Sequence, residues 1–227
     1  MEPIRRKWFD YSFLAFGVLV QVVTFCLSHS LHHTLYTLSL ISGCLGVFSV
    51  VLTAQGNIWM YLFGFAQVAT YTVLCIEQRF YAEIAINAYY FVTMLFGVFA
   101  WRKRLNADTS TVVSRRLTWL STALIVLLTI LGSWLVGWGL AAFTDDTQPY
   151  LDAYTTIPAL VAQVLMIMLF REHWFIWLAV DIFSVILWLR ADDYCMAAQY
   201  AFWCLNCLYG LKRWNSLNTK RLTLNAR

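Results

Sequence analysis

Eight long apolar stretches, separated by short polar segments, constrain this chain more than any other feature of its sequence. A helix that spans a bilayer needs about 20 predominantly apolar residues. Because backbone polar groups have no water partners in lipid, the stretches are predicted to be helices rather than open strands. They cover residues 12–27, 36–53, 59–76, 81–101, 117–140, 150–170, 174–189 and 194–211. We therefore expect an all-α membrane protein with eight transmembrane helices, forming a single transmembrane domain over residues 1–227.

Charged residues make up only 12% of the chain, whereas soluble domains carry roughly 25%. That deficit excludes an ordinary soluble enzyme, a disordered chain and a nucleic-acid-binding protein. With eight spans, both termini share one side of the membrane, and that side holds every Lys and Arg except Arg79 and Arg190. The positive-inside rule then predicts a multi-pass protein of the bacterial inner (plasma) membrane with both termini in the cytoplasm.

The chain also contains an internal repeat with an offset of 113 residues. Tyr61, Tyr81, Gly97 and Trp101 align with Trp174, Tyr194, Gly210 and Trp214. The offset predicts a first three-helix repeat over 36–101, a connecting helix over 117–140 and a second three-helix repeat over 150–212, plus one extra N-terminal helix. Parallel triple-helix repeats are a plan of membrane transporters, which bind substrate near the midplane between the repeats.

One polar stripe lies on the seventh stretch. Trp174, Trp177 and Asp181 share one helix face by their spacing. Asp181 lies about 10 Å below the cytoplasmic end at 1.5 Å per residue, and ionisable groups at such depth are functional candidates. Indole faces and a carboxylate suit a flat cation. The alternatives are an interfacial belt role for Trp174 and a helix–helix hydrogen bond for Asp181.

Two further stripes repeat this spacing on the fourth and eighth stretches. They consist of Glu83, Asn87 and Tyr90, and of Gln199, Trp203 and Asn206. We predict that the three stripes converge on one ligand, whose ring stacks near Trp177 and Trp203 while Asp181, Asn87 and Gln199 bind its polar edges. Hydrogen bonding between helices is the alternative for Gln199 and Asn206, and is the expectation for Gln163.

Metal chemistry is a weak alternative. Cys204 and Cys207 are spaced like half a zinc site but have no second pair, and His29, His32 and His33 cluster in one short loop. Free cysteines usually behave as small buried hydrophobes. No cofactor, no metal site and no catalytic residue is therefore expected.

These stripes and repeats resemble the PnuC family of bacterial vitamin transporters, over residues 61–101 and 173–214. The family motif Trp-x-x-Trp-x-x-x-Asn is matched by Trp174 and Trp177, with Asp181 in place of the Asn. The resemblance implies a SWEET-like arrangement of two three-helix repeats around a connecting helix. It also implies uptake of a B-vitamin, foremost nicotinamide riboside, by facilitated diffusion, with trapping by a cytoplasmic vitamin kinase.

Thiamine is the alternative substrate, because a carboxylate only accepts hydrogen bonds and would suit the N–H groups of an aminopyrimidine. A sugar carrier, an intramembrane enzyme using Asp181 and Glu83, and a receptor without transport are weaker alternatives; no nucleophile elbow or His-Glu-x-x-His motif accompanies the acids. The expected partners are a small cationic vitamin and membrane lipid, with no nucleic acid. The sequence leaves a homo-oligomer open.

Overall fold

The structure, a computed structural model, describes residues 3–28, 34–77, 81–106, 111–145, 148–190 and 194–224. It is an all-helical bundle, apart from one short pair of strands. The helices are α1 (Pro3–Ser28), α2 (Thr34–Gln55), α3 (Met60–Glu77), α4 (Tyr81–Arg102), α5 (Trp119–Phe143), α6 (Pro149–Ile167), α7 (His173–Arg190) and α8 (Tyr194–Leu224); the strands are β1 (Leu105–Asn106) and β2 (Thr111–Val112).

Each predicted apolar stretch falls within or largely within one helix. The bounds differ most at the two ends of the chain, where α1 begins at Pro3 and α8 continues to Leu224. Six helices, α1 to α6, contain stretches long and apolar enough to cross a membrane, whereas the apolar part of α7, His173–Leu187, is shorter. The antiparallel strands β1 and β2 depart from the all-α expectation.

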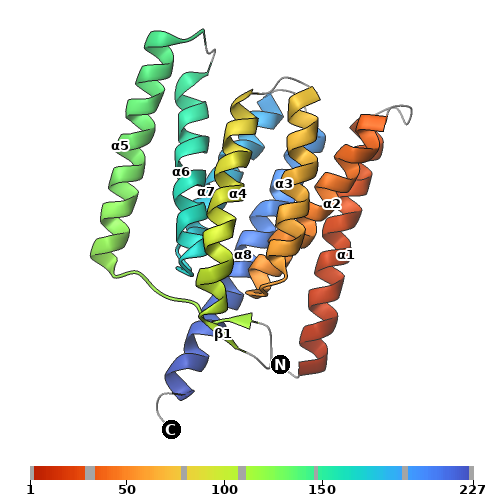
Figure 1. Ribbon diagram of the computed structural model, residues 1–227, viewed down its shortest axis with the longest axis vertical. Helices are drawn as coiled ribbons and strands as arrows, with labels where there is room; N and C mark the ends of the chain where they lie inside the picture. The colour runs from red at the N-terminus through yellow and green to blue at the C-terminus, as the bar shows by residue number, and fades with distance from the viewer. Residues whose placement is uncertain are drawn as a thin grey trace.

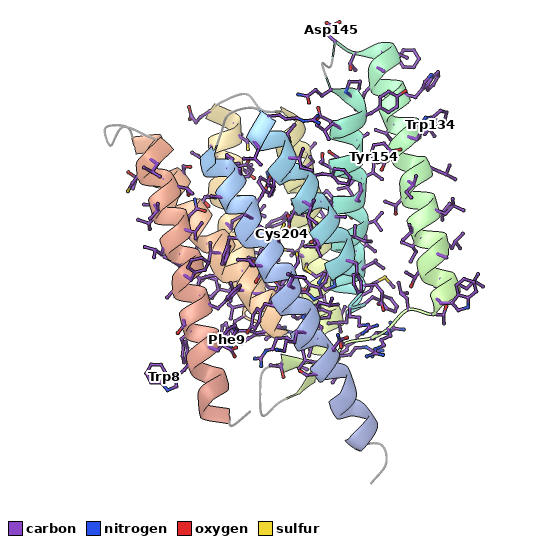
Figure 2. The ribbon with its side chains drawn as sticks, turned by 180° about the vertical axis from the view of Figure 1, so that it is seen from behind. Trp8, Phe9, Trp134, Asp145, Tyr154 and Cys204 are labelled. Atoms are coloured by element: carbon purple, nitrogen blue, oxygen red, sulfur yellow. The ribbon has the colours of Figure 1, made fainter. Side chains whose placement is uncertain are left out.

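The helices lie side by side, with both termini at the end of the bundle that carries β1 (Figure 1). Helix α1 packs against α2 and α8 on one flank, while α5 packs mainly against α6 on the other. Seen from behind, Trp8 and Asp145 mark opposite ends of the bundle (Figure 2). This arrangement matches an even number of passes, which returns the chain to the side from which it started.

Two buried tryptophans tie the halves of the bundle together. The indole Nε1 of Trp101 on α4 donates to the carbonyl of Met166 on α6 at 3.3 Å, and Nε1 of Trp214 on α8 donates to the carbonyl of Thr53 on α2 at 2.9 Å. Each residue of the second bond lies 113 positions from its counterpart in the first. Residues at the sequence offset therefore make equivalent contacts, each crossing from one half to the other.

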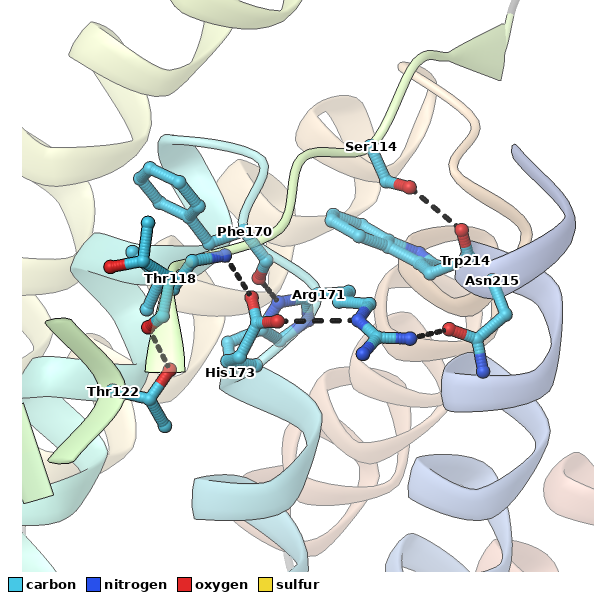
Figure 3. Close-up of polar contacts among 10 residues, drawn as sticks. Ser114, Thr118, Thr122, Phe170, Arg171, His173, Trp214 and Asn215 are labelled. Atoms are coloured by element: carbon cyan, nitrogen blue, oxygen red, sulfur yellow. Dashed lines mark hydrogen bonds and ion pairs between the residues drawn. The ribbon is translucent and has the colours of Figure 1, made fainter. Parts of the chain in front are cut away.

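The turns before α3 and α7 are also equivalent. Gly56 and Leu169, again 113 residues apart, both have positive φ, at 69° and 66°. The linker between α4 and α5 bonds to both turns, because Val112 N–H donates to the Gly56 carbonyl at 2.9 Å and Arg115 N–H donates to the Leu169 carbonyl at 2.7 Å. Ser114 within this linker donates to the carbonyl of Trp214 (Figure 3). The linker thus joins both halves at the end that carries the termini.

Helix α1 is anchored to α8 by a polar cluster at the same end. The Asp10 carboxylate accepts from Tyr209 Oη at 2.6 Å and from Arg213 Nη2 at 2.9 Å. Both side chains of the ion pair are 16% exposed, so solvent screens the pair only in part. The side chain of Asp10 therefore ties the N-terminal helix to the second half of the chain.

Replacing Asp10 by Ala is expected to lower the free energy of unfolding by about 1.5–3 kcal/mol, the range for hydrogen bonds to charged groups. Thermal unfolding of the detergent-purified protein measures the change. Asp145→Ala is the control, because Asp145 is an exposed acid at the opposite end. Equal stability of Asp10→Ala and Asp145→Ala would contradict the anchoring role.

Candidate functional site

Asp181 lies inside the bundle rather than at its surface. It sits midway along α7 with 6% of its surface exposed. The thiol of Cys207 on α8 donates to its Oδ2 at 3.3 Å. The residues 113 positions earlier, Val68 and Met94, are also buried but carry no acid. The second half of the chain therefore places a carboxylate where the first half has two apolar side chains.

The electrostatic surroundings of Asp181 lack a basic partner. The ion pairs among the described residues are Arg171 with Glu172 and Arg213 with Asp10, at 3.2 and 2.9 Å. Arg171 belongs to the network at the cytoplasmic-side turn before α7, where it also bonds to Asn215 (Figure 3). A thiol is only a weak hydrogen-bond donor. A buried carboxylate with this single partner provides a place for a cation.

Aromatic side chains lie on the same helix. Trp174 is 4% exposed and packs edge-on against Trp214, with ring centroids 6.0 Å apart. The belt alternative for Trp174 is therefore wrong, because its indole is inside the core. Trp177 is half-buried and packs against this same hydrophobic core cluster, as does Tyr90 of α4. The structure thus brings members of two predicted stripes to one cluster.

The stripe on α4 is placed only in part. Asn87 is buried, with 4% of its surface exposed. The side chain of Glu83 lies outside the residues whose side chains the structure describes. Tyr90 is half-buried and its ring lies 5.8 Å from that of Tyr89. Asn87 and Tyr90 therefore remain candidates for substrate contact from α4, and Glu83 stays a prediction.

The stripe on α8 divides between two environments. Trp203 packs against a second cluster, formed by Val47, Val51 and Phe202, rather than the cluster that Trp177 joins. Asn206 is 3% exposed and its Nδ2 donates to the Val50 carbonyl on α2 at 3.3 Å. Its Oδ1 is buried without a hydrogen-bond partner. Asn206 therefore holds α2 and α8 together and keeps one acceptor free.

The expected helix–helix role of Gln163 is confirmed. Its Nε2 donates to Thr93 Oγ1 of α4 at 3.2 Å. Thr93 and Gln163 are the counterparts of Asn206 and Val50 at the offset of 113. The two halves therefore meet through one polar side-chain contact at each of two equivalent places, α4 with α6 and α2 with α8.

Gln199 of α8 is half-buried, and the three predicted histidines, His29, His32 and His33, fall outside the described residues. Sequence reasoning missed Cys207, which it treated as an ordinary buried cysteine. No spacing rule could have found it, because its partner Asp181 lies on another helix. Cys204, one turn earlier, lies near the centre of the bundle (Figure 2).

The largest hollow among the described residues is an open groove of about 610 Å³ beside α5 and α6, with Tyr89 of α4 on its wall. None of the predicted site residues lines it. Its lining is largely aliphatic, as a surface facing lipid would be. The groove separates α5 from α4 and leaves the contact between α4 and α6 accessible on that flank.

Comparison with known proteins adds a family and a fold relative. Residues 36–216 match the family described as nicotinamide mononucleotide transporter. The chain is 32% identical to the nicotinamide riboside transporter PnuC of Haemophilus influenzae over 183 residues, covering 79% of this chain and 80% of that protein. It is 31% identical to the protein of the same name from Neisseria mucosa, covering 79% and 72%.

A crystal structure described as that of the vitamin B3 transporter PnuC has the same fold. It superposes with a TM-score of 0.76 at 26% identity, covering 93% of this chain and 92% of that chain. The likeness therefore extends over all the helices rather than one repeat.

Proposed function

The chain belongs to the PnuC family, and on that premise we propose that it is a vitamin B3 transporter that carries nicotinamide riboside across the membrane. The observation that carries the proposal to the level of residues is Asp181, a buried carboxylate without a basic side-chain partner among the described residues. Nicotinamide riboside contains a pyridinium ring with a permanent positive charge. The ring would neutralise the carboxylate that the fold leaves without a counter-ion.

The aromatic neighbours of Asp181 support the same ligand. Trp177 and Tyr90 pack against one cluster from α7 and α4, and cations are attracted to such ring faces. Asn87, Gln199 and the free Oδ1 of Asn206 offer donors and acceptors for the carboxamide and ribose. We keep Trp174, Trp203 and Glu83 as further substrate-contacting candidates, with Trp174 acting from within the packed core.

The transport cycle is proposed to be a rocking of two parallel three-helix repeats, 36–101 and 150–212, about the connecting helix α5. The contact between α2 and α8 is covered by α1, which packs against both helices. The contact between α4 and α6 borders the open groove beside α5. We infer that the α4–α6 contact opens during the cycle, while the α2–α8 contact serves as the hinge.

The cellular setting is also part of the proposal. The basic side chains gather on the side of the termini, which favours cytoplasmic termini in the inner membrane. Uptake would be facilitated diffusion, maintained by a cytoplasmic kinase that phosphorylates and traps the vitamin. Both closely matching relatives carry transporter names, which favours transport over an intramembrane enzyme. Thiamine remains a second candidate, favoured by the acceptor-only carboxylate of Asp181.

Uptake into liposomes tests the proposal. Purified protein should carry labelled nicotinamide riboside down its concentration gradient, saturably and without chemical change, and unlabelled nicotinamide riboside inside the vesicles should accelerate entry. Calorimetric titration with nicotinamide riboside and with thiamine then decides between the two vitamins. Tight binding of thiamine alone would replace the proposed substrate, and a modified product would point to an enzyme.

A further inference from the structure

We propose that the protein exchanges the cationic vitamin for a proton, with Asp181 carrying the proton on the return half of the cycle. The inference rests on the proposed function, because it assumes that the pyridinium ring pairs with Asp181. It goes further by fixing the charge that crosses the membrane. A complete cycle then moves one cation inward and one proton outward, with no net charge transferred.

The packing of Asp181 carries the argument. With 6% of its surface exposed, the carboxyl group has little contact with water, and its recorded hydrogen bond comes from a thiol. Burying a charge without a counter-charge or strong hydrogen bonds is unfavourable. The bound pyridinium ring satisfies this requirement on the inward passage. On the way back the ring is gone, so a proton is the neutralising cation that the site can take.

The groups facing Asp181 offer no substitute for that proton. On α8 the facing titratable groups are the thiols of Cys204 and Cys207, which are acids rather than bases. On α6, the other helix packed against α7, the titratable side chains lie in the first two turns at the opposite end. They are Tyr150, Asp152 and Tyr154.

The cations nearest in sequence are also committed or remote. His173 at the start of α7 is fully buried, and its Nδ1 pairs with the Phe170 carbonyl at 2.7 Å. Arg190 at the far end of α7 is exposed. On α8, Lys212 and Arg213 lie beyond Cys207 toward the end that carries the termini, and Arg213 is paired with Asp10. None of these basic groups pairs with Asp181 among the described residues.

The two halves of the chain show that this acid is an addition rather than a requirement of the packing. The equivalent place in the first half is filled by Val68 and Met94, both buried. The PnuC motif that the chain resembles has Asn where Asp181 stands. An amide of nearly the same shape therefore fits the position, but it cannot bind a proton in this pH range. The replacement Asp181→Asn should separate binding from proton exchange.

The proposed cycle balances in charge and in protons. From outside, the cationic vitamin enters as the Asp181 carboxyl group loses its proton to the outer water, leaving a neutral pair. At the cytoplasmic side the vitamin leaves, and the carboxylate takes one proton from the cytoplasmic water. The neutral, protonated site then returns outward. No covalent bond other than the O–H bond forms or breaks.

Gradients imposed on liposomes test the exchange. Vesicles with an acidic interior, clamped at zero membrane potential by valinomycin and equal potassium, should accumulate labelled nicotinamide riboside against its gradient, about tenfold for a tenfold proton gradient. A potential that is negative inside, imposed without a pH gradient, should leave the final accumulation by the wild-type protein unchanged. A pH-sensitive dye in the vesicles should report alkalinisation during uptake.

Asp181→Asn is the matched variant. It should still take up the vitamin, respond to the potential and ignore the proton gradient. The wild-type measurements decide the matter even if this variant fails to fold. Accumulation by the wild-type protein that follows the potential and not the proton gradient would overturn the exchange while leaving the proposed transport intact. Absence of any nicotinamide riboside uptake would instead overturn the proposed function, and the exchange with it.

Discussion

Replacing Asp181 by Ala is expected to weaken nicotinamide riboside binding by about 30-fold to several thousandfold. The substitution removes the negative charge that would face the pyridinium ring and leaves no acceptor on that part of α7. Truncating one partner of a buried charge pair costs about 2–5 kcal/mol of binding free energy, and each 1.4 kcal/mol is a factor of ten in the dissociation constant. Calorimetric titration of detergent-purified protein measures the change.

Two variants show whether the loss comes from the charge or from the cavity. Val68→Ala shortens a buried side chain at the equivalent place of the first half, so its affinity should stay within about threefold of wild type, a difference below 1 kcal/mol. Asp181→Asn keeps the shape and an acceptor, as in the family motif, and should bind more tightly than Asp181→Ala. Wild-type affinity of folded Asp181→Ala would remove Asp181 from the binding site.

The fold was largely predictable because lipid leaves few choices. Each apolar stretch had to become a helix, and the uneven distribution of Lys and Arg required an even number of passes. The repeated residues at an offset of 113 were informative for a physical reason. Gly97 and Gly210 each leave room for a ring, from Tyr61 and from Trp174, and Trp101 and Trp214 each bond across the two halves. Equivalent contacts kept equivalent residue types.

Contacts between distant helices were the part that spacing could not predict. A helical stripe shows which residues share a face, but it does not show which helix that face meets. The bond between Cys207 and Asp181, and the separation of Trp203 from Trp177, depend on how α8 packs against α7 and α2. The anchoring of α1 by Asp10 joins residues about two hundred positions apart. Such pairs are set by the tertiary packing alone.

Replacing Gly210 by Ala is expected to lower the free energy of unfolding by about 1–3 kcal/mol, the range for overpacking in a well-packed core. A Cβ atom at this position would lie 2.5 Å from Cε2 and from Cζ2 of Trp174. The indole has little room to retreat, because it packs edge-on against Trp214 and lies 4.5 Å from the His173 ring, measured between centroids. Thermal unfolding in detergent should therefore show a clear loss of stability.

Gly139→Ala is the matched control for this substitution. Gly139 also lies inside a helix, but an added Cβ atom there meets nothing within 4 Å. Because Ala favours helix over Gly by up to about 1 kcal/mol, this control should keep or raise the stability, and the same helix preference acts against the loss expected at Gly210. A drop in stability at Gly210 therefore reports the clash with Trp174. If instead Gly210→Ala were as stable as Gly139→Ala, the close approach of Trp174 to α8 would be wrong, and with it the reason why a glycine recurs 113 residues after Gly97.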